Sequence, residues 1–250
     1  MLTTLGIVEA CCHTPAERSL ACRRLGGKSI LEWVVRRATD AQQIDGVMVL
    51  STAGAENELL RRLVPPDVPV YAAKRGDVLG CLVEALEEYR PESAVLIRAD
   101  CPFADPTLID RLVTTALSQG DCEYVGYHSR DGRPTSRSPV GMFAEWFRAK
   151  SLLLAARSAA SAADRDGPTR CLFAHPERFR VRWIPAPEQI DREDVRLTVD
   201  IEEDWEHMLT IFDALGPEEL DWRRIANLLN HQPALRRRMA ALNRAHARTV

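Results

Sequence analysis

Residues 94–106 read AVLIRADCPFADP, and this stretch decides the fold. Four apolar residues of strand type lead into an acid and a proline, and Pro106 is a favourable first residue for a helix. An acid that follows a buried strand lies at the edge where parallel α/β sheets bind ligands. The stretch therefore predicts a strand over 94–97, a turn that presents Asp100, and a helix from Pro106.

The same alternation extends toward the N-terminus, where short apolar runs are separated by amphipathic segments of helical length. Strands separated by helical crossovers predict a mostly parallel sheet covered on both faces. We therefore expect an α/β fold, a three-layer sandwich. The further strands expected here are 5–10, 47–51 and 68–71. Three helices are expected between them: one with Ser29 as its N-cap, one over 56–64, and one that begins at Asp77.

The rest of the chain is less regular but contains no repeat, low-complexity tract or linker, so we treat 1–250 as a single domain with 216–250 as a C-terminal helical extension. The expected elements are a strand at 123–127, a polar excursion at 129–139, a helix at 143–161, a turn at 164–168, strands at 179–184 and 196–200, and helices at 201–215, 217–230 and 233–248.

Composition excludes several classes of protein. The net charge of −3 provides no bulk attraction to nucleic acid or an anionic membrane. No run approaches the roughly 18 apolar residues of a membrane span, and the first residues lack the basic region of a signal peptide, so we expect a cytoplasmic protein. Seven cysteines without a Cys-x-x-Cys motif are expected to be free thiols. Cys11, Cys12, His13 and Cys22 cluster in the sequence, but their spacing matches no zinc pattern.

Two acids stand where strands are expected to end. Asp100 follows the strand at 94–97, and Asp200 closes the strand at 196–200. Carboxylates from two strand ends can converge on one Mg²⁺ ion, which prefers one or two carboxylates together with substrate phosphates. Such an ion offsets the charge that develops on an α-phosphate as pyrophosphate leaves. The alternative is that both acids are turn or helix caps without chemistry.

Several other groups are weaker candidates. Gly26, Gly27 and Lys28 precede a helix and present an amine to a phosphate or to solvent, although they do not form a Walker loop. The segment 75–77 fits either a helix cap or a ligand loop. The arginines of the 129–139 excursion can bind an anionic substrate or simply be solvated, and the basic C-terminal helix lacks the interleaved aromatics of a nucleic-acid binder.

Five short blocks in this order resemble the spore-coat polysaccharide biosynthesis cytidylyltransferase family, which is related to the CMP-sialic acid and CMP-Kdo synthetases. The resemblance covers nearly the whole chain, and its most specific block is Ala99-Asp100-Cys101-Pro102 with Asp105-Pro106. The other blocks are 25–32, 76–79, 175–179 and 196–204.

The resemblance implies a nucleotide-diphospho-sugar transferase (GT-A-like) fold, one nucleotidyltransferase-like domain, and use of CTP and Mg²⁺ to convert a sugar or sugar acid to its CMP derivative. It implies a homodimer and assigns 129–148 to sugar binding and dimer contact. It also implies that Asp100 and Asp200 bind the metal and act in catalysis with Arg18. The nucleotide-binding residues implied are Val8, Glu9, Ala10, Lys28, Ser51, Thr52, Asp77, Arg98 and Ala99.

The chain departs from this family in the phosphate loop after the first strand. Two arginines and a lysine that normally hold the triphosphate are Cys11, Ala16 and Leu20 here. Each charge-assisted phosphate contact contributes about 1.5–3 kcal/mol, so their loss would cost orders of magnitude in rate. The basic side chains available to replace them are Arg18, Arg23, Arg24, Lys74 and Arg98.

Three hypotheses follow. The first is an active cytidylyltransferase with a rebuilt phosphate loop, acting in the synthesis of a surface polysaccharide or a related compound. The second is a catalytically impaired relative that serves as a binding or partner subunit. The third is a protein that binds a nucleotide sugar in the manner of a glycosyltransferase, since one fold supports several functions.

Overall fold

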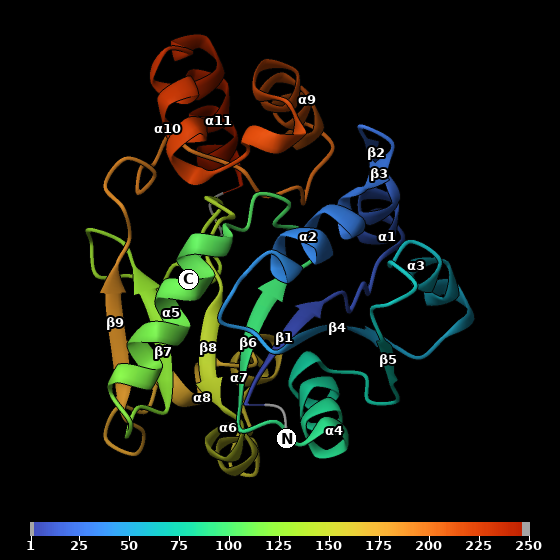
Figure 1. Cartoon of the computed structure of the whole chain (residues 1–250), viewed down its shortest axis with the longest axis vertical. Helices are drawn as coiled ribbons and strands as arrows, with labels where there is room; N and C mark the ends of the chain where they lie inside the picture. The colour runs from blue at the N-terminus through green and yellow to red at the C-terminus, as the bar shows by residue number, and fades with distance from the viewer. Residues whose placement is uncertain (1–2, 247–250) are drawn as a thin grey trace.

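The structure, a computed structural model, describes residues 3–246 and is built on one seven-stranded sheet (Figure 1). The strand order is β5-β4-β1-β6-β8-β7-β9, and β8 runs antiparallel to both neighbours while the other pairs are parallel. This confirms the mostly parallel sheet. The strands are β1 (Thr4–Glu9), β4 (Gly46–Thr52), β5 (Val70–Ala73), β6 (Ser93–Arg98), β7 (Tyr124–His128), β8 (Glu145–Arg148) and β9 (Val181–Pro185); β2 (Arg24–Leu25) and β3 (Lys28–Ser29) form a separate hairpin.

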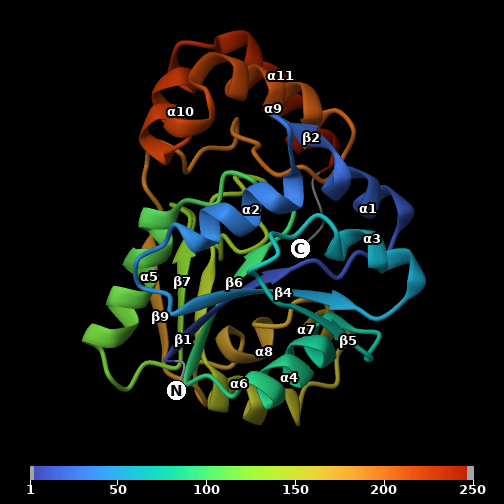
Figure 2. The same cartoon turned by 45° about the vertical axis from the view of Figure 1, so that its right-hand side comes forward.

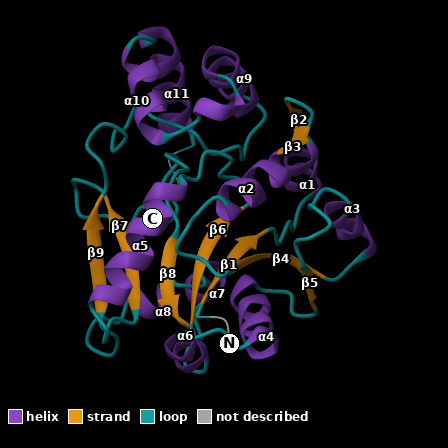
Figure 3. Ribbon diagram, viewed as in Figure 1, coloured by secondary structure: helices purple, strands orange, loops and turns teal. Residues whose placement is uncertain are grey.

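Helices cover both faces of the sheet, which confirms the three-layer sandwich (Figure 3). One core contains buried side chains of α2 (Ile30–Thr39) and α5 (Pro106–Ser118). The other contains those of α4 (Val78–Tyr89), α6 (Ala149–Ala156) and α8 (Arg170–Phe173). The central strands are buried from both sides, as Ile7 and Val8 are both 0% exposed. The remaining short helices are α1 (Pro15–Cys22), η1 (Ala55–Asn57), α3 (Glu58–Arg61) and α7 (Ala162–Asp166).

Side-chain caps fix the starts of the helices that follow the strands. Ser29 Oγ accepts a hydrogen bond from the backbone N of Glu32 at 3.0 Å, and Asp77 Oδ1 accepts one from Gly80 at 2.8 Å. Asp105 caps α5 in the same way, with Pro106 as the first helical residue. The predicted helix starts at Ser29, Asp77 and Pro106 are therefore confirmed.

The C-terminal helices α9 (Asp204–Leu215), α10 (Trp222–Asn230) and α11 (Pro233–Ala245) gather on the side of the sheet toward which β6 and β9 point (Figures 1 and 2). The short helix η2 (Pro217–Glu219) links α9 to α10. Their buried side chains belong to the same core as those of α2 and α5. The predicted end of the last helix, at about Arg248, lies outside the described residues.

Two predictions in the middle of the chain are wrong. The helix expected over 143–161 begins instead as β8, and only 149–156 is helical. The aromatic residues at 146 and 147 are buried, as in a helix, but their backbone pairs with β6. This pairing satisfies the backbone hydrogen-bonding groups on that side of β6. The polar segment expected as a turn at 164–168 instead includes part of α7, whose start is capped by Ser161.

The strand predicted over 196–200 is also wrong. This segment is extended, but its backbone bonds to loops rather than to a strand: Leu197 N donates to Pro139 O at 2.7 Å and Val199 N to Asp100 O at 2.8 Å. The alternation of apolar residues still indicates burial, since Leu197 and Val199 are both buried. The absence of a neighbouring strand makes the segment a tether between two loops.

Candidate active site

Asp100 lies at the edge of the sheet where the two central parallel strands end together. Glu9, the last residue of β1, is in register with Arg98, the last residue of β6, and Ala99 N donates to Glu9 O at 2.9 Å. The side chain of the next residue, Asp100, is 26% exposed. The order strand, acid, turn, helix predicted from residues 94–106 is thus confirmed.

Arg98 binds the Asp100 carboxylate with two groups of its guanidinium. Arg98 Nε donates to Oδ1 at 2.9 Å and a terminal nitrogen donates to Oδ2, so both carboxylate oxygens have an arginine donor. Burial alone would raise the pKa of Asp100, but the charge and hydrogen bonds of Arg98 outweigh it and hold that pKa below its usual value. Asp100 is therefore ionised near neutral pH.

Asp200 comes to the same edge because the 196–200 segment crosses over two loops. The backbone bond from Val199 to Asp100 ties the two acids together, and the charge of Asp100 contributes to the raised pKa of Asp200. Gly141 makes this crossing possible, since its φ is +61° and an added Cβ would lie 2.7 Å from Thr198 N. The two acids predicted to converge therefore lie at one site.

The surroundings of Asp200 include two residues whose roles the sequence analysis missed. Arg196 pairs with both Asp200 and Asp204, and Asp204 also accepts from the backbone N of Asp200 and of Ile201 at 3.2 Å each. Burial, the hydrogen bond with Asp204 and repulsion from Asp204 and Asp100 raise the pKa of Asp200 to about 6, against the opposing charge of Arg196. The sequence signal that could have found this pairing is an acid four residues beyond Asp200, in the first turn of a helix.

Glu9 adds a third acid to this edge of the sheet, which we call the rim. Its carboxylate accepts a hydrogen bond from Cys11 N at 2.9 Å, and burial raises its pKa with a smaller contribution from the charge of Asp100. Val8 and Ala10, the predicted nucleotide-binding neighbours of Glu9, are buried at 0% and 1% exposure. Their backbone is engaged as well, since Val8 pairs with both neighbouring strands and Ala10 N donates to Leu50 O at 2.8 Å.

A cavity of about 490 Å³ opens beside the carboxyl end of β4. Its wall includes Ser51 and Thr52, two predicted nucleotide-binding residues, together with Asn57, Arg61 and Ala72. Asn57 holds Thr52 in place, because its amide donates to the Thr52 hydroxyl at 2.6 Å and to the Thr52 carbonyl at 3.2 Å. The size of this cavity suits a nucleoside.

Asp77 and Lys28, also predicted to bind nucleotide, are engaged in local contacts. Asp77 caps α4 and pairs with Arg165 of α7 at 3.3 Å. Lys28 Nζ lies 5.0 Å from the centroid of the Trp33 ring, on the hairpin whose Gly26 turn faces Phe212 of α9. These contacts support the structural alternatives considered for both residues.

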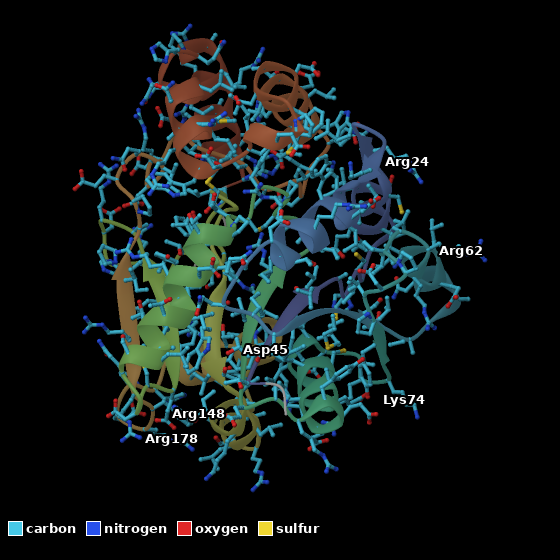
Figure 4. The ribbon with its side chains drawn as sticks, in the orientation of Figure 1. Arg24, Asp45, Arg62, Lys74, Arg148 and Arg178 are labelled. Carbon is cyan, nitrogen blue, oxygen red and sulfur yellow. The ribbon has the colours of Figure 1, made fainter. Side chains whose placement is uncertain are left out.

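The phosphate loop carries little positive charge toward the rim. Cys11 and Cys12 are buried, and Arg18, the candidate catalytic arginine, donates to the Cys12 carbonyl at 3.0 Å. Figure 4 shows Arg24 and Lys74 at the outside of the molecule, pointing away from the sheet. Arg23 pairs with Glu202. Of the five basic residues considered as replacements, Arg98 is the one in contact with a rim carboxylate.

The donor set fits Mg²⁺. Asp100 and Asp200 supply hard oxygen donors from two loops at one edge, and a cation between them would relieve the repulsion that raises the pKa of Asp200. Within residues 3–246 no group of three or more His, Cys, Asp or Glu side chains has the arrangement of a metal site. A two-carboxylate site of this kind is completed by substrate phosphates and water.

Other predictions can be placed directly. All seven cysteines are free thiols. In the 129–139 loop, Arg130 is bound to Asp191 by its backbone and side chain. No helix among the described residues is long and apolar enough to cross a membrane.

The sheet order, the helical layers and the acids at the rim define a nucleotide-diphospho-sugar transferase-like fold. A cytidylyltransferase from Leptospira borgpetersenii has this fold, with a TM-score of 0.79 at 19% identity over 93% of this chain and 95% of that one. The model of the MobA-like NTP transferase domain matches residues 18–197. The chain therefore belongs to the MobA-like NTP transferase family.

Two relatives extend the likeness over most of the sequence. The uncharacterized protein MJ1063 of Methanocaldococcus jannaschii is 25% identical over 233 residues, which are 93% of this chain and 92% of that protein. The spore coat polysaccharide biosynthesis protein SpsF of Bacillus subtilis is 25% identical over 219 residues, 84% of this chain and 87% of its own length. The resemblance inferred from the motif order is thereby supported.

Proposed function

We propose that the protein is a Mg²⁺-dependent cytidylyltransferase that transfers CMP from CTP to a sugar or sugar acid and releases pyrophosphate. The observation that carries the proposal is the meeting of Asp100 and Asp200 at the carboxyl edge of the sheet. The likeness to a cytidylyltransferase and to a polysaccharide biosynthesis protein supports the choice of CTP and of a sugar acceptor.

The reaction assigned to this site is a displacement at phosphorus. An acceptor hydroxyl oxygen forms a bond to the α-phosphorus, the bond from that phosphorus to the bridging oxygen breaks, and the hydroxyl proton passes to a base or to water. Bound Mg²⁺ supplies charge neutralisation on the phosphate oxygens while pyrophosphate leaves. Asp100 and Asp200 hold the metal, and the cavity beside Ser51 and Thr52 holds the nucleoside.

The test is release of pyrophosphate from CTP and Mg²⁺ by the full chain with a panel of sugars, polyols and sugar acids. UTP, ATP and GTP serve as competing nucleotides. We expect turnover with CTP, and a loss of at least about 100-fold in Asp100→Ala, because the ion that neutralises the reacting phosphate loses one of its two carboxylate ligands. Asp67→Ala, at an exposed position before β5, is the control.

Two results together would contradict the proposal. One is the absence of pyrophosphate with every acceptor, and the other is a melting temperature that CTP and Mg²⁺ leave unchanged. Turnover that survives unaltered in Asp100→Ala would contradict the assignment of the site.

A second candidate function, a binding or partner subunit without turnover, is favoured by the phosphate loop. Arg18 is bonded to its own loop carbonyl, and Cys11 and Cys12 are buried where the family places a basic residue at the first of these positions. This candidate predicts binding of CTP without release of pyrophosphate, so the same assay separates the two.

A further inference from the structure

The rim already contains a cation of its own. The guanidinium of Arg98 occupies both oxygens of Asp100, through Nε on Oδ1 at 2.9 Å and a terminal nitrogen on Oδ2. These are the same two oxygens that a divalent metal would use. A metal that binds Asp100 must therefore compete with a charge-assisted, two-point hydrogen bond.

Arg98 is placed so that it can leave Asp100 without leaving the site. Its side chain is 22% exposed, and its remaining terminal nitrogen donates to the Ser136 carbonyl at 3.0 Å, which anchors the guanidinium to the 129–139 loop. Arg196, the partner of Asp200, is different. It is 4% exposed and also paired with the buried Asp204, so it is fixed in place.

We propose that Arg98 is a resident cation at Asp100 which a divalent metal must displace, and that the displaced guanidinium then binds a phosphate of the nucleotide. The inference rests on the proposed function, because it requires a metal–nucleotide substrate. It accounts for a phosphate loop without its usual basic residues, since the cation is provided from the end of β6 instead. Arg98 is then a phosphate-binding residue that also sets the order of binding: metal alone binds weakly, and metal with nucleotide binds well.

The test uses Mn²⁺ as the probe, titrated into the full chain and followed by electron paramagnetic resonance, with and without CTP. Titrations are made at about pH 8, where Asp100 is ionised in each variant. In Arg98→Gln we expect Mn²⁺ alone to bind about tenfold more tightly, because its competitor is gone. In the presence of Mn²⁺ we expect CTP to bind about tenfold more weakly, because one phosphate contact is lost.

The chain offers a matched control in Arg192, which binds Asp194 across the same two-residue spacing. Arg192 Nε lies 2.9 Å from Asp194 Oδ1, and its terminal nitrogen lies 3.2 Å from Oδ2. Arg192→Gln breaks a similar pair that includes neither Asp100 nor Asp200, and it should leave both titrations as in the wild type. Arg98→Lys serves as a second variant, since it keeps the charge but lacks the planar two-nitrogen fork that binds the two oxygens in parallel. It should bind Mn²⁺ alone more tightly than the wild type even if Arg98→Gln does not fold.

Opposite changes in the two titrations support the proposal. It is wrong if Arg98→Gln, or Arg98→Lys where Gln is not folded, binds Mn²⁺ no more tightly than the wild type, or if the affinity for CTP is unchanged. Failure of the proposed function would look different: the wild type itself would neither bind CTP with Mn²⁺ nor release pyrophosphate. If the wild type turns over CTP while the Arg98 variants bind Mn²⁺ alone no more tightly than the wild type, the proposed role of Arg98 is wrong and the proposed function stands.

Discussion

At the scale of single residues, the environment of Asp200 disfavours its ionised form and raises its pKa to about 6. Asp200 shares its surroundings with two other acids, Asp204 and Asp100, and with one arginine, Arg196. Desolvation and the neighbouring negative charges together disfavour its ionised form. Binding of a cation next to Asp200 would stabilise the ionised form of its carboxylate.

The raised pKa of Asp200 predicts a pH dependence of folding stability in the metal-free protein. The folded chain holds this proton up to about pH 6, whereas the unfolded chain releases it near the ordinary aspartate pKa of 3.8. Between these values the folded state binds more protons, so Asp200 lowers stability as pH rises. Asp200→Asn removes this loss, while Arg196 keeps its pairing with Asp204. Above about pH 6 we expect the variant to be more stable than the wild type by roughly 2 kcal/mol.

Urea denaturation with a chelator at a series of pH values measures this difference. Asp131→Asn, in an exposed loop, is the control and should follow the wild type. A difference between Asp200→Asn and the wild type that does not grow between about pH 4 and pH 6 would show that the environment of Asp200 is not as described.

The sequence was informative about the two acids and silent about their partners. Asp100 could be placed because a buried strand, an acid and a proline form a local pattern. The bonds of Arg98 to Asp100 and of Arg196 to Asp204 could not, because many arginines stand at such spacings and only the tertiary approach of loops selects which pairs form. The sequence therefore predicts the positions of the two acids but not which arginine each acid pairs with.

At the scale of elements, the crossing of the 196–200 segment over Gly141 holds Asp200 at the rim. Gly141→Ala places a methyl group 2.7 Å from Thr198 N and 2.9 Å from Leu197 C, both backbone atoms that cannot turn aside. We expect the variant to lose about 2–4 kcal/mol of stability and most of its affinity for Mn²⁺ with CTP. Calorimetry and the metal titration measure the two effects.

Gly132→Ala separates the strain of a positive φ from the clash. Gly132 has φ +75° but an added Cβ there has nothing within 4 Å, so its cost should be only about 1 kcal/mol, with metal binding intact. Equal behaviour of the two variants would mean that the crossing does not position Asp200.

Two of the wrong predictions, the helix at 143–161 and the strand at 196–200, share one cause. Periodicity identifies which residues are buried, and 143–147 and 197–199 are indeed mostly apolar and buried. It does not identify the hydrogen-bonding partner of a segment. Residues 145–148 pair with β6 as an antiparallel strand, whereas 197–199 bond to loops and have no strand neighbour. The strands β1, β4 and β6 were predicted because local pattern and sheet pairing agree there.

At the scale of the whole molecule, the C-terminal helices are packed against the seven-stranded sheet domain. Leu235 of α11 and Ile225 of α10 lie in the same core as α2 and α5, and Trp222 N donates to Asp105 Oδ2, the cap of α5, at 2.9 Å. We therefore predict that the chain unfolds in a single transition, in line with one domain over 1–250.

Leu235→Ala tests this unity. The side chain is 1% exposed, so its truncation should lower the free energy of unfolding by about 2–4 kcal/mol while the transition stays single by circular dichroism and tryptophan fluorescence. Leu154→Ala, on α6 with 51% exposure, should change stability by less than about 0.5 kcal/mol. Two separate transitions, with only one shifted by Leu235→Ala, would show that 216–250 folds as an independent unit.

The central claim is that Asp100 and Asp200 bind one metal ion together with the nucleotide. The most direct measurement is the amount of Mn²⁺ bound per chain in the presence of CTP, compared between the wild type, Asp100→Asn and Asp200→Asn. Our account predicts one bound Mn²⁺ in the wild type and loss of that binding in each variant. Undiminished Mn²⁺ binding in either variant would contradict it.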